Sequence, residues 1–329
     1  MVRAGNADLR PDGLLLTRRR HFVIFNPASG RGRGKRRIAA YRRLLSERLE
    51  HVEFGETIRP GHERELADEA LGEGYDVIVA VGGDGTWSNV ADRIVGAGRD
   101  DVAFGLLPSG TGNDFGRNMG YDPRKPADAV EVLARGRTRL VDVGRVDTPS
   151  AAEQRSDQLE TRHFLNLIGF GFDIAVIDGA ADARFLRGEL LYKITALQQL
   201  LRFPGLSARV ESAGGETREA RHLMLTISNG RYFGGGFPIA PEATVDDGKL
   251  HACLIADARP LTRLRLFNLA ERGRHVASPE VEILEDSAFR LEFDTPPRFE
   301  MDGDVRRASG TKIQVRCMPA ALRIVAPDG

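Results

Sequence analysis

The chain has 329 residues, enough for two domains that each bury a core, and its apolar and charged fractions of 41% and 29% exclude a disordered or fibrous protein. Lys plus Arg and Asp plus Glu both number 47, and this balanced charge gives no reason to expect nucleic acid as a partner. No apolar stretch reaches the roughly 20 residues that a membrane-spanning helix needs. We therefore expect a cytoplasmic protein without a transmembrane segment, whose contact with lipid is peripheral.

The first half of the chain alternates short apolar runs with segments of helical periodicity. Strands are predicted at 21–25, 75–81 and 102–108, and helices at 36–50, 89–98 and 127–136. Because strand and helix alternate, we expect a parallel sheet with helices on both faces. The prediction is a doubly wound α/β domain over residues 18–140.

The second half changes to short, often alternating strands that turn residues separate. These strands are predicted at 139–146, 164–172, 222–230, 249–255, 281–286, 289–293 and 312–317. Two helices interrupt them, at 189–203 and 260–273, and the polar stretch 149–160 is a predicted surface loop. The pattern predicts a β-sandwich-like domain over residues 141–319. A last strand, 321–326, fits either domain.

Three glycine-bearing loops each follow a strand of the first half, at residues 26–35, 82–87 and 108–114. Ligands of an open parallel sheet bind beyond the carboxyl ends of its strands, so such loops converge on one crevice. The first loop is not a P-loop, because its spacing differs and Arg36 stands where the magnesium-binding hydroxyl belongs.

An acidic residue, Asp84, stands within the second loop, "GGDGTW". Gly82, Gly83 and Gly85 let the backbone approach a nucleotide closely, and a helix that begins near Thr86 directs its N–H groups at an anion. Carboxylate and phosphate repel each other, but a bridging Mg²⁺ makes the arrangement attractive. Asp84 would then organise the ion. The alternative is that Asp84 caps a helix and the glycines form a tight turn.

The motifs "NPASG", "GGDGT" and "PSGTGNDF", in this order and spacing, resemble the catalytic domain of the diacylglycerol kinase family, especially the bacterial soluble lipid kinases related to sphingosine and ceramide kinases. The resemblance continues in "FLNLIGFGFD", "SNGRYFGGGF", "PEATVDDGKL" and "MDGD", so it covers nearly the whole chain. It implies ATP bound between an α/β domain and a β-rich domain. It also implies that the final strand, 320–329, returns to the first domain.

Carried over position by position, the resemblance implies a set of nucleotide contacts in the three loops and the segment "ETIRPGH". The set is Asn26, Pro27, Ala28, Ser29, Gly30, Thr57, Gly82, Gly83, Asp84, Gly85, Thr86, Trp87, Ser88 and Thr111. The family often continues "GGDGT" with Asn and Glu, whereas this chain has Ser88 and Asn89. The resemblance therefore leaves open whether one hydrogen bond near the phosphates, made in the family at these positions, is also made here.

The resemblance also implies a catalytic base, the acid that ends a D-G-E motif, which reads Asp302-Gly303-Asp304 here. Phosphoryl transfer to an alcohol requires positioning, charge neutralisation and removal of one proton, which a nearby carboxylate accepts. Asp304 is one methylene shorter than Glu, so its loop has to lie further inward. Turn statistics alone favour a simple hairpin turn at this motif.

The segment "TVDDGKL" resembles a structural magnesium site of the family, separate from the catalytic ion. Asp247 would supply a carboxylate, and Thr244 and the backbone of Lys249 would supply further oxygens, with water completing the shell. The alternative is an ordinary Asp-Gly turn.

The resemblance implies a Mg²⁺- and ATP-dependent lipid kinase that phosphorylates a primary hydroxyl of a diacylglycerol-like or sphingoid-like lipid. The apolar stripe of 189–203 fits packing against the β-rich domain or contact with an anionic membrane surface. Two other functions stay open: an NAD kinase, and a catalytically silent nucleotide-binding regulator, for which Asp304 in place of Glu is the one indication. The identity of the lipid and the formation of a homodimer are also left open.

Overall fold

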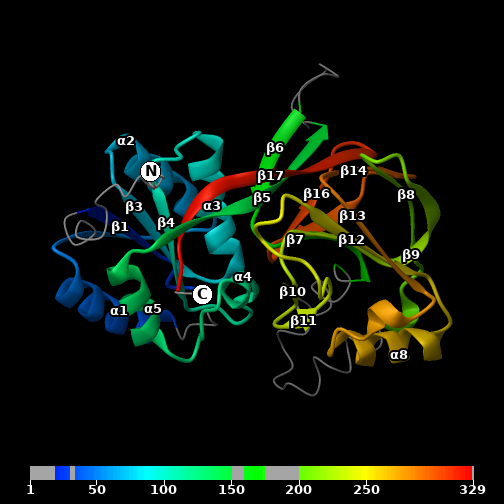
Figure 1. Cartoon of the computed structure of the whole chain (residues 1–329), viewed down its shortest axis with the longest axis horizontal. Coiled ribbons are helices and arrows are strands. Elements are labelled where there is room, and N and C mark those ends of the chain that lie inside the picture. Colours follow the sequence, from blue (N-terminus) through cyan, green and yellow to red (C-terminus); the bar gives the residue numbers. More distant parts are fainter. Residues whose placement is uncertain (1–18, 30–33, 150–158, 173, 175–199, 328–329) are drawn as a thin grey trace, which may run out of the picture.

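The computed structural model describes residues 19–29, 34–149, 159–172, 174 and 200–327. The chain forms two lobes (Figure 1): an N-terminal lobe in which helices flank a parallel sheet, and a C-terminal lobe built mainly of antiparallel strands. Hydrogen bonds join most strands of both lobes into one 15-stranded sheet. The predicted fold class, an α/β domain followed by a β-rich domain, is confirmed.

Four parallel strands form the centre of the N-terminal lobe. They are β1 (Arg20–Phe25), β2 (His51–Glu56), β3 (Val77–Gly82) and β4 (Ala103–Pro108), in the order β2-β1-β3-β4. β3 and β4 are buried along their whole length, as expected for strands with helices on both faces. The sequence analysis did not predict β2, because its residues alternate with glutamates at the edge of the sheet.

In the described part of the N-terminal lobe, helices accompany this sheet. They are α1 (Gly34–Arg48), α2 (His62–Gly72), α3 (Asp84–Gly96), α4 (Asp114–Asn118) and α5 (Pro126–Arg135). α1 packs beside α5, and α2 packs beside α3. α3 begins at Asp84, two residues before the helix start predicted near Thr86 and five before the periodic stretch 89–98, so the second glycine loop is shorter than its motif suggests.

The strand β17 (Lys312–Val325) runs through both lobes (Figure 1). Its first part pairs antiparallel with β14 (Ala288–Phe293), and near its end Ile324 lies opposite Phe104 of β4 in parallel register. Along most of its length it also pairs with β5 (Thr138–Pro149). The structure thus merges the two strands predicted at 312–317 and 321–326 into one, which enters the N-terminal lobe.

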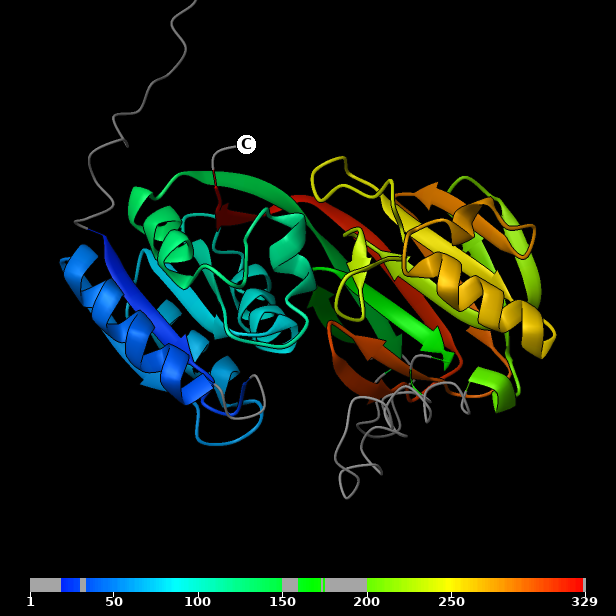
Figure 2. The same ribbon diagram turned by 90° about the horizontal axis from the view of Figure 1, so that it is seen from below.

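Most of the other strands of the C-terminal lobe are short, although β9 (Thr217–Ser228) has 12 residues. The others are β6 (Leu159–Phe164), β7 (Leu167–Gly171), β8 (Leu206–Ser212), β12 (Leu250–Ala256), β13 (Val281–Asp286), β15 (Arg298–Met301) and β16 (Asp304–Arg307). β10 (Tyr232–Phe233) and β11 (Phe237–Pro238) form a separate hairpin. The helix α8 (Pro260–Ala270) lies along the strands of this lobe (Figure 2).

The two faces of these strands belong to two apolar clusters. In β12, Leu250, Ala252 and Leu254 belong to one cluster, whereas Cys253 and Ile255 belong to the other, which also contains Leu266 of α8. This alternation follows from the two-residue period of a strand. The predicted helix 189–203 lies outside the described residues except for 200–203, as do 150–158 of the predicted loop. Among the described residues, no helix is long and apolar enough to cross a bilayer.

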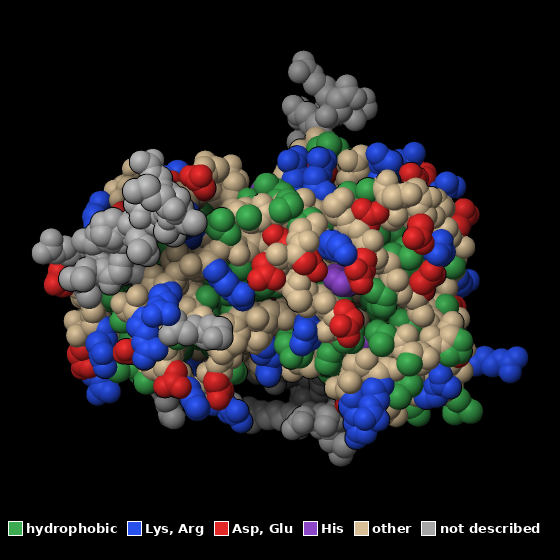
Figure 3. Space-filling view, viewed as in Figure 1, with side chains coloured by type: hydrophobic (Ala, Val, Ile, Leu, Met, Phe, Trp, Pro, Cys, Tyr) green, Lys and Arg blue, Asp and Glu red, His purple; other side chains and the backbone are tan. Residues whose placement is uncertain are grey.

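Basic and acidic side chains are interspersed on the face seen in Figure 3, and neither sign forms a large field there. This mixed surface agrees with the equal numbers of basic and acidic residues in the sequence.

Because β17 completes the sheet of the N-terminal lobe, its last residues should contribute strongly to stability. Ile324 has no exposed surface, and Ile324→Ala is expected to lower the free energy of unfolding by about 2 to 4 kcal/mol, because it leaves a cavity. Gln314→Ala, at an exposed position of the same strand, is the control and should change it by less than about 0.5 kcal/mol. Urea denaturation measures both, and equal losses in the two variants would contradict the role of β17.

Candidate functional site

A cavity of about 1240 Å³ lies between the two lobes. Its wall has two chemically different ends. The glycine-rich end is formed by the loops that follow β1, β3 and β4, together with Asp304. The apolar end is formed in the C-terminal lobe and includes Phe172, Leu223, Met224, Phe237, Leu266 and Phe267. The sequence analysis predicted the first end and not the second.

The three predicted loops converge at the glycine-rich end. Asn26 donates a hydrogen bond from its side chain to the hydroxyl of Thr86 at 3.0 Å, and the hydroxyls of Ser29 and Ser109 are 2.6 Å apart. A Cβ atom on Gly110 would lie 2.5 Å from the Cα of Gly83, so only glycine permits these two loops to touch. The convergence leaves bare backbone facing the cavity, as a phosphate-binding site requires.

Most of the predicted nucleotide contacts line this cavity. Those that do are Asn26, Pro27, Ala28, Ser29, Thr57, Gly83, Asp84, Gly85, Thr86 and Thr111. Gly30 lies outside the described residues.

Gly82, Trp87 and Ser88 are not part of the cavity wall, and their contact with a nucleotide stays a prediction. Trp87 is completely buried in the core of the N-terminal lobe, where its indole N–H donates to the carbonyl of Ala80 at 3.1 Å. Ser88 is buried too, and its hydroxyl lies toward the carbonyl of His163. A Cβ atom on Gly82 would collide with the side chain of Thr86, so this glycine serves packing.

Asp84 is held at the start of a neighbouring helix. Its Oδ1 accepts the backbone N–H of Phe115 in α4 at 3.0 Å. The capping alternative is therefore realised, although for α4 and not for the helix that Asp84 begins. Burial raises the pKa of Asp84, and the N–H groups at the start of α4 oppose this shift. Asp84 nevertheless lines the cavity.

A second buried carboxylate, Asp114, lies beside Asp84. Burial, and next the charge of Asp84, raise the pKa of Asp114 to about 6. Its Oδ2 accepts the N–H of Gly235 at 2.8 Å. Two neighbouring carboxylates in a low-dielectric wall favour the binding of a cation, so these residues fit Mg²⁺.

Protein side chains alone do not complete a metal site here. The described residues include no group of three or more His, Cys, Asp or Glu side chains arranged to hold a metal ion. Magnesium is usually bound by one or two carboxylates together with phosphate oxygens and water. The carboxylates of Asp84 and Asp114 therefore fit a Mg²⁺ ion whose other ligands are phosphate oxygens of a nucleotide and water.

The turn Asp302-Gly303-Asp304 is anchored by its first residue. The carboxylate of Asp302 accepts the N–H groups of Leu165, Asn166 and Leu167 at 2.7, 3.0 and 2.9 Å. The predicted strand 164–172 therefore divides into β6 and β7. The N–H groups of Leu165 and Asn166, between the two strands, donate to the carboxylate of Asp302 and not to a neighbouring strand. Burial raises the pKa of Asp302 to about 6, although its N–H partners act in the opposite direction.

Asp304 begins β16 and is partly exposed to the cavity. Its Oδ1 lies 3.1 Å from where a Cβ atom of Gly85 would be, so the turn approaches the second glycine loop closely. The side-chain amide of Asn89 donates to Asp304 at 3.2 Å and to the buried Glu63 at 2.9 Å. Asn89 was noted in the sequence only as a departure from a motif, and nothing there indicates that it contacts Asp304.

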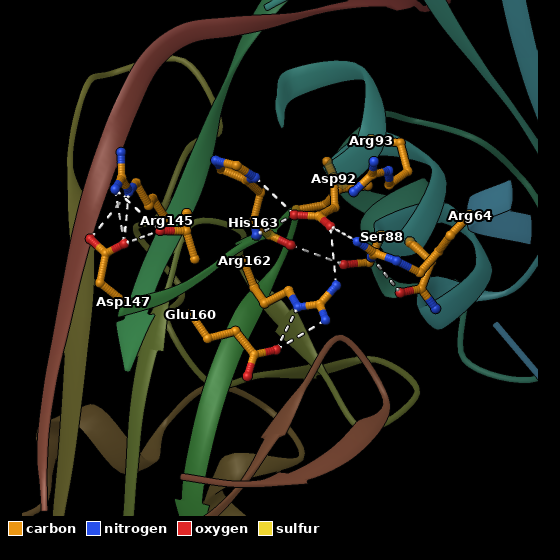
Figure 4. Close-up of polar contacts among 12 residues, drawn as sticks. Arg64, Ser88, Asp92, Arg93, Arg145, Asp147, Glu160, Arg162 and His163 are labelled. Carbon is orange, nitrogen blue, oxygen red and sulfur yellow. Dashed lines mark hydrogen bonds and ion pairs between the residues drawn. The ribbon is translucent and has the colours of Figure 1, made fainter. Parts of the chain in front are cut away.

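Behind this site, Asp92 of α3 is the centre of an ionic network (Figure 4). Its carboxylate lies 2.6 Å from Nη2 of Arg64, 2.8 Å from Nδ1 of His163 and 3.7 Å from Nη1 of Arg162. Burial alone would raise the pKa of Asp92, but His163 and Arg64 outweigh burial and lower it to about 2. The network joins α2 and α3 to β6, and therefore one lobe to the other.

The predicted structural magnesium site, at Thr244, Asp247 and Lys249, is separate in the sequence from Asp84 and Asp114. Oδ1 of Asp247 accepts the N–H of Lys249 at 3.0 Å, and Gly248 has a φ of +74°, which is the Asp-Gly turn. Thr244 is exposed. The buried Asp142 binds the N–H of Gly248 and of Ala320, so its oxygens already hold the turn. An ion at Thr244, Asp247 and Lys249 stays a prediction.

Comparison with known proteins identifies the family. Residues 20–146 match the diacylglycerol kinase catalytic domain, and residues 166–326 match the YegS C-terminal NAD kinase beta sandwich-like domain. A protein of Mycobacterium tuberculosis named diacylglycerol kinase is 30% identical over 316 residues, which are 94% of this chain and 97% of that protein. This chain belongs to the diacylglycerol kinase family.

Other members of the diacylglycerol kinase family are similarly related. A Pseudomonas aeruginosa protein named as a YegS-like lipid kinase is 30% identical over 94% of each chain. A crystal structure of a diacylglycerol kinase from Bacillus anthracis superposes with a TM-score of 0.73 over 94% of this chain and 97% of that chain, at 18% identity, and shows a shared fold. The predicted resemblance is confirmed.

The ionic network around Asp92 should stabilise the protein in a pH-dependent way. Folding lowers the pKa of Asp92 from 3.8 to about 2, so its stabilisation is present above pH 3.8 and is lost as the pH falls toward 2. Asp92→Asn is expected to cost about 3 to 5 kcal/mol at pH 7, because Arg64 and His163 lose a buried anion. Urea denaturation at several pH values should show this difference shrinking below pH 4.

The control is Asp68→Asn, which removes the exposed partner of Arg93. It should cost less than about 1 kcal/mol. An Asp92→Asn effect as large at pH 2.5 as at pH 7 would contradict the assigned network.

Proposed function

We propose that this protein is a lipid kinase that transfers the γ-phosphoryl group of ATP to a primary hydroxyl of a diacylglycerol-like lipid. The observation that carries the proposal is the single cavity in which a glycine-rich end and an apolar end meet. Asp302 binds the N–H of Leu167, whose side chain belongs to the apolar cluster of the second end. The turn that carries Asp304 therefore lies where the two ends join.

The apolar end favours a lipid acceptor over a polar dinucleotide. The ribose and phosphate groups of NAD would lose hydration against Phe172, Leu223 and Met224 without gaining hydrogen bonds. Acyl chains have no such penalty, and their burial is favourable by about 25 cal/mol per Å². The relatives named as diacylglycerol kinase and lipid kinase support the same choice.

The chain retains the residues that chemistry requires, which argues against a silent regulator. In the proposed reaction, the acceptor oxygen forms a bond to the γ-phosphorus as the bond to the departing ADP oxygen breaks, and the hydroxyl proton passes to Asp304. The close approach of Asp304 to Gly85 compensates for its short side chain. Asn89 orients the carboxylate from behind.

The glycine-rich end would bind the triphosphate through backbone N–H groups of the loops at Gly83 and Gly110 and through the start of α3. A Mg²⁺ ion held at Asp84 and Asp114 would neutralise phosphate charge. Thr57, Asn26 and Ser29 lie along the same wall and would position the nucleotide.

We further propose that the enzyme takes its substrate at a membrane surface in the cytoplasm. α8 lines the apolar end with Leu266, Phe267 and Ala270, and at its beginning Leu261 is 83% exposed. Arg259 and Arg265 are exposed nearby, and from residue 258 to 270 there is no acidic residue. This combination suits contact with anionic lipid.

The assignment of the base is tested by Asp304→Asn. With ATP, Mg²⁺ and a panel of lipids, we expect kcat to fall about 10² to 10⁴-fold, because the acceptor proton has no base. ATP affinity should be nearly unchanged, since ground-state contacts of the nucleotide are kept. The control is Asp294→Asn, an exposed carboxylate on the same lobe. Turnover of Asp304→Asn at the wild-type rate would mean that another residue is the base.

The apolar end is tested by Ala270→Phe, which places a ring where α8 faces the cavity. Phosphorylation of a long-chain diacylglycerol should fall about tenfold or more relative to a short-chain one, because less apolar surface fits in the cavity. ATP hydrolysis in the absence of lipid is measured alongside and should not change. An equal effect on both chain lengths would mean that the acyl chains lie elsewhere.

A further inference from the structure

A guanidinium group, that of Arg306, stands beside the proposed base. Asp304 and Arg306 are two residues apart on β16, so their side chains project from the same face of the strand, and both line the cavity. Arg307, the last residue of β16, projects from the opposite face of the strand and is exposed.

Arg306 lines the cavity, and among the described residues it has no acidic side chain within hydrogen-bond distance. Arg64 is held by Asp92 at 2.6 Å, and Arg162 is held by Glu160 at 3.0 Å. Arg306 has Asp304 at 3.8 Å, too far for a hydrogen bond, and its buried Nε has no acceptor among the described residues. A buried donor without an acceptor is costly, so such a group generally marks the place of a ligand or water.

We propose that Arg306 is the anion-binding residue of a phosphomonoester subsite next to Asp304. There it holds the phosphoryl group as it reaches the acceptor, and afterwards the phosphate of the phosphorylated lipid. A guanidinium suits this ligand, because its planar N–H fork matches two phosphate oxygens at once. The subsite rests on the proposed kinase function, since it takes the product of that reaction.

The charges near Arg306 change during the proposed reaction in a direction that favours this role. Before transfer, the carboxylate of Asp304 attracts Arg306 weakly across 3.8 Å. When Asp304 accepts the proton of the hydroxyl, this attraction ends, and at the same moment the new phosphomonoester carries between one and two negative charges. The strongest partner of Arg306 is then the product phosphate.

The test compares two neighbouring arginines. Arg306→Met and Arg307→Met remove the same charge from adjacent positions, but only Arg306 faces the cavity. Binding of a short-chain phosphatidate and of the matching short-chain diacylglycerol is measured by calorimetry, without nucleotide or metal. We expect Arg306→Met to weaken phosphatidate binding about 10- to 100-fold and to leave diacylglycerol binding unchanged. Arg307→Met should change neither.

Two further measurements test whether the phosphate group itself is recognised and whether the paired N–H groups of the guanidinium are needed. Inorganic phosphate should compete with phosphatidate in the wild type and not with diacylglycerol. Arg306→Lys keeps the charge without the fork and should lose less affinity than Arg306→Met. The midpoint of urea unfolding, compared with the wild type, confirms that each variant is folded.

The subsite is overturned if the wild type binds phosphatidate no better than diacylglycerol, or if Arg306→Met and Arg307→Met bind phosphatidate equally. The kinase assay is separate from these binding measurements. Arg306-dependent binding of phosphatidate without phosphorylation of any lipid would refute the proposed function alone, and the reverse result would refute the subsite alone.

Discussion

Backbone N–H groups that bind buried carboxylates determine how the parts of this site fit together. Asp84 of α3 binds the start of α4, Asp114 of α4 binds the glycine-rich segment at Gly235, and Asp302 binds the chain between β6 and β7. Each contact joins segments that are distant in the sequence. Because an N–H group offsets only part of the cost of burying a carboxylate, the wall is left negative, and it is suited to a cation that accompanies a phosphate.

The relation between the two lobes is determined by two further features, the shared strand β17 and the ionic network of Asp92. β17 belongs to the sheet of both lobes, and Asp92 connects α3 with His163 and Arg162 of β6. The glycine-rich end and the apolar end therefore belong to one cavity, and both lobes contribute to its wall. The proposed reaction needs a nucleotide and a lipid in contact, and a wall that both lobes hold in place would favour it.

The sequence predicts those parts of the site that depend on local chemistry. Glycine loops after buried strands indicate a phosphate site, and the structure brings residues 26–29, 83–86 and 111 together. The apolar end is not predictable in this way, because β7, β9, β12 and α8 contribute separate residues that each resemble an ordinary core residue. The side chain of Trp87 is buried in the core, which its place next to a motif did not indicate. Likewise, Pro319 and Ala320 resemble a turn, with φ +52° at Ala320, yet β17 continues past them, because it pairs with β5 on both sides of a register shift between Met318 and Leu322.

The residues around Asp304 bear on its proposed role as the catalytic base. An additional methylene would carry the carboxylate further toward the second glycine loop, where Oδ1 already lies 3.1 Å from the Cβ position of Gly85. A carboxylate at position 89 would place a second negative charge at 3.2 Å from Asp304, whereas the amide of Asn89 donates a hydrogen bond over this distance. On the other side Arg306 contributes a positive charge. In the proposed role of Asp304 the residues at 89 and 304 act together, since the amide of Asn89 orients the shorter acid, which lies close to the second glycine loop.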